Sequence, residues 1–191
     1  MAGGAVNTPQ LLMLSGIGDE QQLRRHGIAV HHHSPEVGRG LMDHFVAGLG
    51  YSVDDGSLFS AAGFSELVNY LLRRKGALTS CIEEAYGFVR SRSDLPLPDL
   101  EIMFSSAPFF DQGLVAPTEH AVILGAILLT PVSRGHITLR SADPTAKPSI
   151  DPRYLSDSAG VDRNAVLCGL RTCTALASAP SLYGAGTPAA S

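Results

Sequence analysis

The sequence predicts an α+β fold in which a mostly antiparallel sheet is flanked by helices. Helix-like runs with start and stop signals open and close the chain. Strand-like runs fill most of its middle, at residues 45–53, 85–90, 100–104, 122–130 and 135–140. Because strands that follow one another directly seldom form a doubly wound parallel sheet, this order favours an antiparallel layer with helices packed on it.

The composition is that of an ordinary globular protein with one or two domains. The chain has 191 residues, of which 45% are hydrophobic and 17% charged. Its formal net charge of −4 gives no reason to expect nucleic acid or an anionic membrane as a partner. The longest apolar run, residues 121–129, is too short to cross a bilayer, which takes about 20 residues in a helix. We expect it to form a fully buried strand.

The first predicted element is a short helix that follows a cluster of small residues, Gly3, Gly4 and Ala5. Thr8 can cap a helix and Pro9 suits the first helical position, so the helix is expected to begin there. Residues 11–14 supply its apolar face, and residues 15–18 (SGIG) end it. Since glycine has no side chain, a ligand or another backbone can approach closely at the small-residue cluster.

The next elements follow from capping signals and apolar spacing. Residues 19–26 predict a second helix, with Asp19 and Gln22 as a capping pair and Gly27 as a left-handed stop. Alternating residues at 28–32 predict an edge strand, and residues 45–53 a further strand.

The second half of the chain continues the pattern. Apolar spacing predicts a helix over 66–74 that ends at Gly76, and residues 85–90 and 100–104 predict strands. Residues 122–130 and 135–140 are expected to pair with each other around a turn at 131–134. The clearest predicted helix is 158–179, in which apolar residues recur at helical spacing, and residues 180–191 have little to bury and predict a disordered tail.

Several reactive side chains favour structural interpretations. The three cysteines, Cys81, Cys168 and Cys173, lack metal-ligand spacing and are expected to be small buried hydrophobic residues in a reducing compartment. With no targeting segment visible, we expect the cytoplasm. Consecutive strand residues point to opposite faces, so the three histidines at 31–33 predict no metal site. Glu83 and Glu84 fit a solvated strand end better than a catalytic carboxylate pair.

Three segments together resemble the glucose-methanol-choline (GMC) family of flavin oxidoreductases. They are residues 1–18 (MAGGAVNTPQLLMLSGIG), residues 37–44 (VGRGLMDH) and residues 133–144 (SRGHITLRSADP). The first resembles the family's second signature, and the order and spacing of all three agree with the family. The resemblance implies an enzyme that takes a hydride from a CH–OH carbon of a small-molecule alcohol to FAD.

The resemblance also implies a division of the chain and a set of cofactor residues. Residues 1–44 would be a remnant of the FAD-binding domain with its flavin lid, and residues 45–179 the substrate-binding domain. The implied cofactor-binding residues are Gly3, Gly4, Ala5 and Asn7, nearest the flavin, and Gly38, Asp43 and His44, in the lid. Gly40 and Met42 stand where the family usually has Asn and Gln, which removes two polar groups from the lid.

Two family elements are not found in this sequence. No strand, GxGxxG turn and helix precede residue 1, and the similar spacing at 184–189 has no helix after it. The family's catalytic histidine would follow the last predicted helix, and none of the seven histidines lies beyond His136. We therefore assign no catalytic residue and expect the chain to be inactive alone. The alternative is a non-catalytic module that pairs with a complementing chain.

Overall fold

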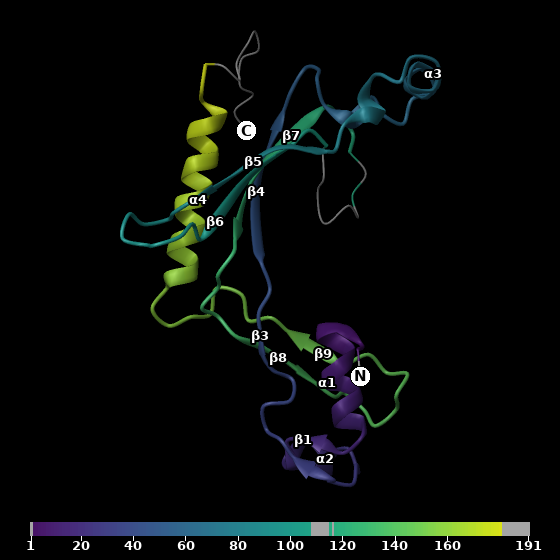
Figure 1. Cartoon of the computed structure of the whole chain (residues 1–191), viewed down its shortest axis with the longest axis vertical. Helices are drawn as coiled ribbons and strands as arrows, with labels where there is room; N and C mark the ends of the chain where they lie inside the picture. The colour runs from purple at the N-terminus through teal and green to yellow at the C-terminus, as the bar shows by residue number, and fades with distance from the viewer. Residues whose placement is uncertain (1, 108–114, 116, 181–191) are drawn as a thin grey trace. The chain divides into compact units, whose positions relative to one another are not determined.

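The structure is a computed structural model that describes residues 2–107, 115 and 117–180 (Figure 1). By their contacts, the described residues fall into two compact units. The first lies within Met1–His44 and Pro131–Asp162, and the second within Phe45–Thr130 and Arg163–Ser191. The division into FAD-binding remnant, lid and substrate-binding domain concerns function and stays a prediction. By contacts alone, residues 131–162 belong with the start of the chain.

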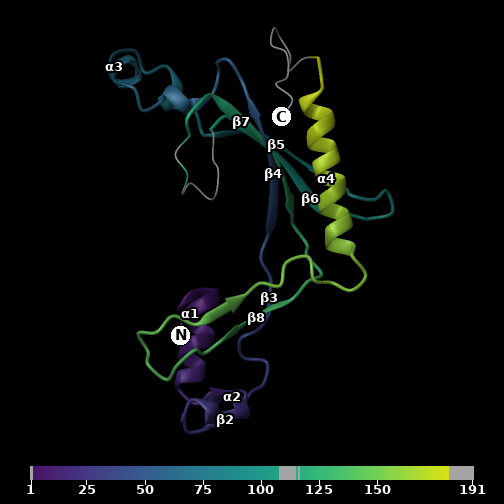
Figure 2. The same cartoon turned by 180° about the vertical axis from the view of Figure 1, so that it is seen from behind.

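The predicted fold class, a mostly antiparallel α+β fold, is confirmed. The second unit contains a four-stranded antiparallel sheet in the order β4-β7-β6-β5. These strands are β4 (Phe45–Ser52), β5 (Glu83–Val89), β6 (Leu100–Ser105) and β7 (Ala121–Leu128). The helix α4, Val161–Ala177, runs along this sheet in both views (Figure 1 and Figure 2). The apolar run forms β7 as expected, but the strand is not fully buried, because Val122, Ile123 and Ile127 are only half-buried.

One face of this sheet is covered by α4. Ile102, Leu124, Ala126 and Cys173 form a buried cluster between the sheet and the helix. A Cβ built on Gly169 of α4 would lie 2.5 Å from the Cβ of Ala126, so glycine is what allows this close approach. Burial raises the pKa of the Cys173 thiol, as expected for a small apolar core residue. The expected burial is wrong for Cys81, which is exposed just before β5, and Cys168 is half-buried.

The first unit is built around the first helix. It contains α1 (Gly4–Leu14), β1 (Ile17–Gly18), α2 (Glu20–Arg25), β2 (His32–His33), β3 (Arg39–Leu41), β8 (Gly135–Thr138) and β9 (Ser149–Asp151). The strands β3, β8 and β9 form one antiparallel sheet, and β1 pairs with β2 in parallel. The core of this unit is the buried cluster Met13, Leu23, Ile137 and Leu139. Packing thus joins residues that are more than a hundred positions apart.

The predicted start of the first helix is wrong. The helix begins at Gly4, and Pro9 lies inside it rather than at its first position. Thr8 still serves the helix start, but its Oγ1 reaches back and accepts the N–H of Gly3 at 3.0 Å. Proline removes the donor for the carbonyl of Ala5, four residues earlier, and Ala5 is exposed, so water can solvate that group.

The stops and the second helix are confirmed. Gly16 and Gly27 both have positive φ, directly after α1 and α2 have ended. The Asp19 side chain accepts the Gln22 N–H at 2.9 Å as the cap of α2.

Two predicted strands differ from the structure. Within residues 28–32 only His32 is in a strand, because the partner strand β1 has two residues and pairs with His32 and His33. The predicted pairing of 122–130 with 135–140 is wrong. Both edges of β7 are occupied, by β4 and β6, so β8 joins β3 and β9 instead.

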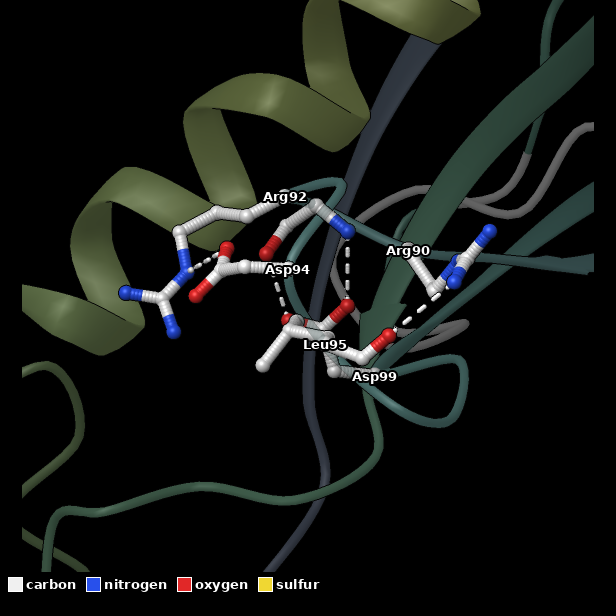
Figure 3. A network of polar contacts seen from close by, with 6 residues as sticks. Arg90, Arg92, Asp94, Leu95 and Asp99 are labelled. Atoms are coloured by element: carbon white, nitrogen blue, oxygen red, sulfur yellow. Dashed lines mark hydrogen bonds and ion pairs between the residues drawn. The ribbon is translucent and has the colours of Figure 1, made fainter.

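The hairpin between β5 and β6 is held by polar contacts within its own loop (Figure 3). The Asp99 carboxylate accepts the Ser91 N–H at 2.7 Å, and Arg90 donates to the Leu95 carbonyl at 3.0 Å. An exposed ion pair joins Arg92 and Asp94 at 3.4 Å. These contacts fix the register that aligns Val89 with Leu100.

The remaining segments connect the four strands of the second unit. The helix α3 covers Phe64–Arg73, close to the predicted range, and is flanked by the short 3₁₀ helices η1 (Leu58–Ser60) and η2 (Ala77–Thr79). The tail predicted to be disordered lies, beyond Pro180, outside the described residues. Among the residues that the structure describes, no helix is both long enough and apolar enough to cross a membrane.

Candidate cofactor and substrate site

The first turn of α1 presents backbone without covering side chains. Gly3 is half-buried, and Gly4, Ala5 and Asn7 are exposed. Gly4 has φ +74°, and a Cβ built on it would meet no atom within 4 Å. The free N–H groups and the positive end of the helix dipole favour a partly negative ligand atom. The turn can therefore accept a ligand against its backbone.

Gly38 lies at the opposite end of α1. Its carbonyl accepts the Ile137 N–H at 2.6 Å. A Cβ built on Gly38 would lie 3.6 Å from the methyl group of Met13 in α1. Met13 follows Gly4 by nine residues, which corresponds to about 14 Å along a helix. The structure thus packs Gly38 against β8 and does not bring it together with the first turn of α1.

Asp43 and His44 lie between β3 and β4, and both are exposed. The Tyr154 hydroxyl donates a hydrogen bond to the Asp43 carboxylate. This bond raises the pKa of the Tyr154 phenol. Ionisation of the phenol would break the hydrogen bond and place a phenolate beside the negatively charged Asp43 carboxylate. Tyr154 was not identified from the sequence, since 111 residues separate it from Asp43 and no local pattern links them.

We expect the Tyr154 phenol to titrate above its ordinary value of about 10 in the folded chain. Replacing Asp43 with asparagine should lower that pKa towards 10, since the neutral amide no longer opposes the phenolate. Tyrosinate absorbance near 295 nm, compared with a Tyr154→Phe difference spectrum, measures the shift. An unchanged titration in the Asp43→Asn variant would show that the carboxylate does not contact Tyr154 in solution.

The second unit has a hollow of about 450 Å³ beside η2 and α3. Glu66, Ser80 and Glu84 contribute carboxylates and a hydroxyl to it, and Ser80 Oγ donates to Glu84 at 2.5 Å. Glu83 and Glu84 are exposed at the start of β5, where a solvated strand end was expected.

Two histidines have polar partners close by. His120 Nδ1 lies 2.9 Å from Ser57 Oγ, which is buried. His136 Nε2 lies 3.9 Å from an Asp151 carboxylate oxygen. His120 belongs to the second unit and His136 to the first, and we assign neither as a base. In the described ranges no three His, Cys, Asp or Glu side chains are grouped to hold a metal ion.

Comparison with known proteins identifies the family. A GMC oxidoreductase N-terminal family model matches residues 1–46, and a GMC oxidoreductase C-terminal model matches residues 131–191. An uncharacterized GMC-type oxidoreductase of Mycobacterium tuberculosis is 58% identical over 182 residues, covering 95% of this chain and 34% of that protein. The alcohol dehydrogenase [acceptor] of Pseudomonas putida is 40% identical over 185 residues, covering 94% of this chain and 33% of that protein.

Solved structures agree with this assignment. The formate oxidase of Aspergillus oryzae aligns with a TM-score of 0.77 and 28% identity, over 91% of this chain and 35% of its own. The chain thus spans about a third of the length of the relatives it matches. Both ends of the sequence match the same family, and the fold agrees with a solved member, so the chain belongs to the GMC family of flavin oxidoreductases.

Proposed function

We propose that this chain supplies the substrate-binding part of an FAD-dependent enzyme that oxidises a CH–OH group. The family carries this proposal, together with the open first turn of α1, where Gly4 leaves room for a ligand against the backbone. FAD would supply the redox chemistry as the hydride acceptor. The relative named alcohol dehydrogenase [acceptor] supports an alcohol as the donor.

The described residues fit part of a flavin site. Gly4 and Ala5 offer exposed backbone and Asn7 a side-chain amide that can bind polar flavin atoms, while the Gly3 N–H is already donated to Thr8 Oγ1. Asp43 and His44 offer further exposed polar groups, and Gly38 holds the chain that carries them against β8. No GxGxxG turn between a strand and a helix is found in these 191 residues, so the pyrophosphate would need groups outside this sequence.

The role of this chain is to orient the substrate and to exclude water. The β4-β7-β6-β5 sheet has α4 on one face, which leaves its other face to form a wall of the substrate pocket. We assign no catalytic base to this chain. The base must come within hydrogen-bond reach of the alcohol proton, and by the family resemblance it would follow the last predicted helix, beyond which these 191 residues contain no histidine.

The chain alone is expected to bind FAD weakly or not at all and to oxidise no alcohol. Fusing it to the N-terminal and C-terminal segments of the M. tuberculosis relative should produce flavin binding and dye reduction with alcohols. Measuring bound flavin by absorbance and dye reduction over an alcohol panel tests both statements. Near-stoichiometric flavin, or turnover, in the 191-residue chain alone would contradict them.

Gly4 can be tested against a matched glycine. Gly4 and Gly27 have φ of +74° and +69°, and a Cβ on either would meet nothing within 4 Å. Alanine therefore introduces similar backbone strain at both positions. In the fused protein, Gly4→Ala should weaken FAD binding about tenfold, since a methyl group then covers the open turn. Gly27→Ala should leave it unchanged, and equal losses in both variants would argue against a flavin at α1.

A second candidate function is a non-catalytic module that pairs with a complementing chain. The observation in its favour is that the described residues fit only part of a flavin site. Co-expression of the missing segments as a separate chain tests it. A stable complex that binds no flavin and reduces no dye would favour this alternative over the enzyme.

A further inference from the structure

The sheet of the second unit has one covered and one open face. Residues directly opposite each other on paired strands lie on the same face of the sheet. Tyr86 therefore shares a face with Met103, and Phe88 shares it with Glu101. In the same way Met103 shares this face with Gly125, and Val46 shares it with Ile127. Alternate residues, such as Ile102 and Ala126, face α4. The open face is therefore formed mainly by Val46, Tyr86, Phe88, Met103, Ile123 and Ile127, with Glu101 among them.

The open face is apolar and accessible. Tyr86 is 66% exposed, Phe88 54% and Val46 53%. The two rings contact each other edge to face, with centroids 5.8 Å apart. Soluble proteins seldom leave aromatic side chains of a strand this exposed unless they contact a ligand or a partner.

Two glycines keep the centre of the open face shallow. A Cβ on Gly125 would lie 3.0 Å from Met103 Cγ, and a Cβ on Gly48 would lie 3.1 Å from Ile123 Cγ2. The Met103 and Ile123 side chains therefore lie across these glycines. The result is a continuous apolar floor beside the Tyr86–Phe88 pair, and its flexible methionine can adapt to the shape of a ligand.

The charges on this face select against anions. Glu101 pairs with Phe88 and Ile127 in the register, and Glu83 pairs with Ser105 at the end of the sheet. The described strand residues of this face include no lysine or arginine. A substrate carboxylate would be repelled there, and most hydroxyl groups of a polyol would lose water without gaining a partner, since Glu101 is the one charged side chain among the apolar ones named above.

We propose that the open face binds the carbon skeleton of an alcohol with an aromatic or alkyl body and no acidic group, and that Tyr86, Phe88 and Met103 set this preference. This inference rests on the proposed function, because it takes the open face as the wall of the substrate pocket. Polyols and hydroxy acids are then poor substrates for the same enzyme.

Methionine methyl groups provide a direct test on the 191-residue chain. With ¹³C-labelled methyls, Met103 reports on the open face, and Met13 and Met42 report on the first unit. Benzyl alcohol and 1-hexanol should shift the Met103 resonance in a saturable way and leave those of Met13 and Met42 unchanged. Glycerol should shift none of them, and 4-(hydroxymethyl)benzoate should bind at least about tenfold more weakly than benzyl alcohol.

Variants separate this face from the rest of the surface. Phe88→Ala should weaken benzyl alcohol binding about tenfold. Leu97→Ala, at a side chain that is 73% exposed in the β5–β6 loop, should not change it. Equal shifts at all methionines, or comparable effects of glycerol, would overturn the inference. A Met103 shift that depends on protein concentration instead of alcohol would also overturn it, in favour of self-association.

The fused protein distinguishes failure of the inference from failure of the proposed function. Dye reduction with glycerol or 4-(hydroxymethyl)benzoate but not with benzyl alcohol would refute the apolar preference and leave the oxidoreductase intact. Reduction by no alcohol, with FAD bound, would refute the proposed function. A kcat/KM for benzyl alcohol at least about tenfold above that for its carboxylate analogue supports both.

Discussion

Replacing Gly38 with alanine is expected to destabilise the first unit by about 3–4 kcal/mol. Gly38 has φ +83°, and a Cβ built there would overlap the carbonyl oxygen of Ile137. The left-handed conformation costs a non-glycine residue about 1–2 kcal/mol, and crowding in a packed region adds about 1–3 kcal/mol. The new methyl group also separates Gly38 from β8, whose Ile137 N–H bonds its carbonyl at 2.6 Å.

Gly40 provides the matched control for this substitution. It has φ +72° in the same segment, but a Cβ there would meet nothing within 4 Å. Gly40→Ala should therefore cost only the conformational part, about 1 kcal/mol. Urea unfolding followed at the buried Met13 methyl group measures the free energy of unfolding of the first unit in both variants. Equal losses would show that Gly38 and Ile137 are not in close contact in solution.

Replacing Asp162 with asparagine should destabilise the chain by about 3 kcal/mol at neutral pH. Asp162 is 1% exposed, and its two carboxylate oxygens accept the Val132 N–H at 2.7 Å and the Ser133 N–H at 2.8 Å. An asparagine can accept only one of them and turns its own N–H groups towards the other. A buried donor left without a partner costs about 1–3 kcal/mol, and more beside a lost charge.

The same carboxylate makes the free energy of unfolding depend on pH. Burial raises the pKa of Asp162, but hydrogen bonds from Ser133 and from the two backbone amides, with the charge of Arg134, outweigh it and leave the pKa lowered. A lowered folded pKa stabilises the fold above the unfolded value of about 3.9, and this contribution is lost as pH falls through the folded pKa. The stability difference between the native chain and Asp162→Asn should therefore shrink below about pH 4.

Asp143 serves as the control for acid sensitivity. Its pKa is lowered by hydrogen bonds from Thr145 in an exposed loop. Because water surrounds both residues in the folded chain as well as in the unfolded chain, these bonds contribute little to stability. Asp143→Asn should change the urea midpoint little at any pH. If Asp162→Asn behaves in the same way, the buried carboxylate does not hold the turn at 132–133.

Local sequence signals determined the elements that depend on local contacts. Asp19 caps α2, and Gly16 and Gly27 end their helices, because these effects act within one turn of the chain. The apolar run at 121–129 predicted the strand itself, whereas the open face of the sheet leaves Ile123 and Ile127 only half-buried. Family resemblance rests likewise on short segments, and the fold class followed from the order of helices and strands.

Strand partners and site contacts were decided only by the tertiary structure. The apolar runs at 122–130 and 135–140 are adjacent in the sequence, yet β7 already has two neighbours and β8 joins strands from both ends of the chain. Tyr154 meets Asp43 across 111 residues, and Gly38 packs against Ile137. A strand's hydrogen-bonding edges accept any strand of suitable register, so sequence specifies which residues can pair, and packing of the whole unit selects which do.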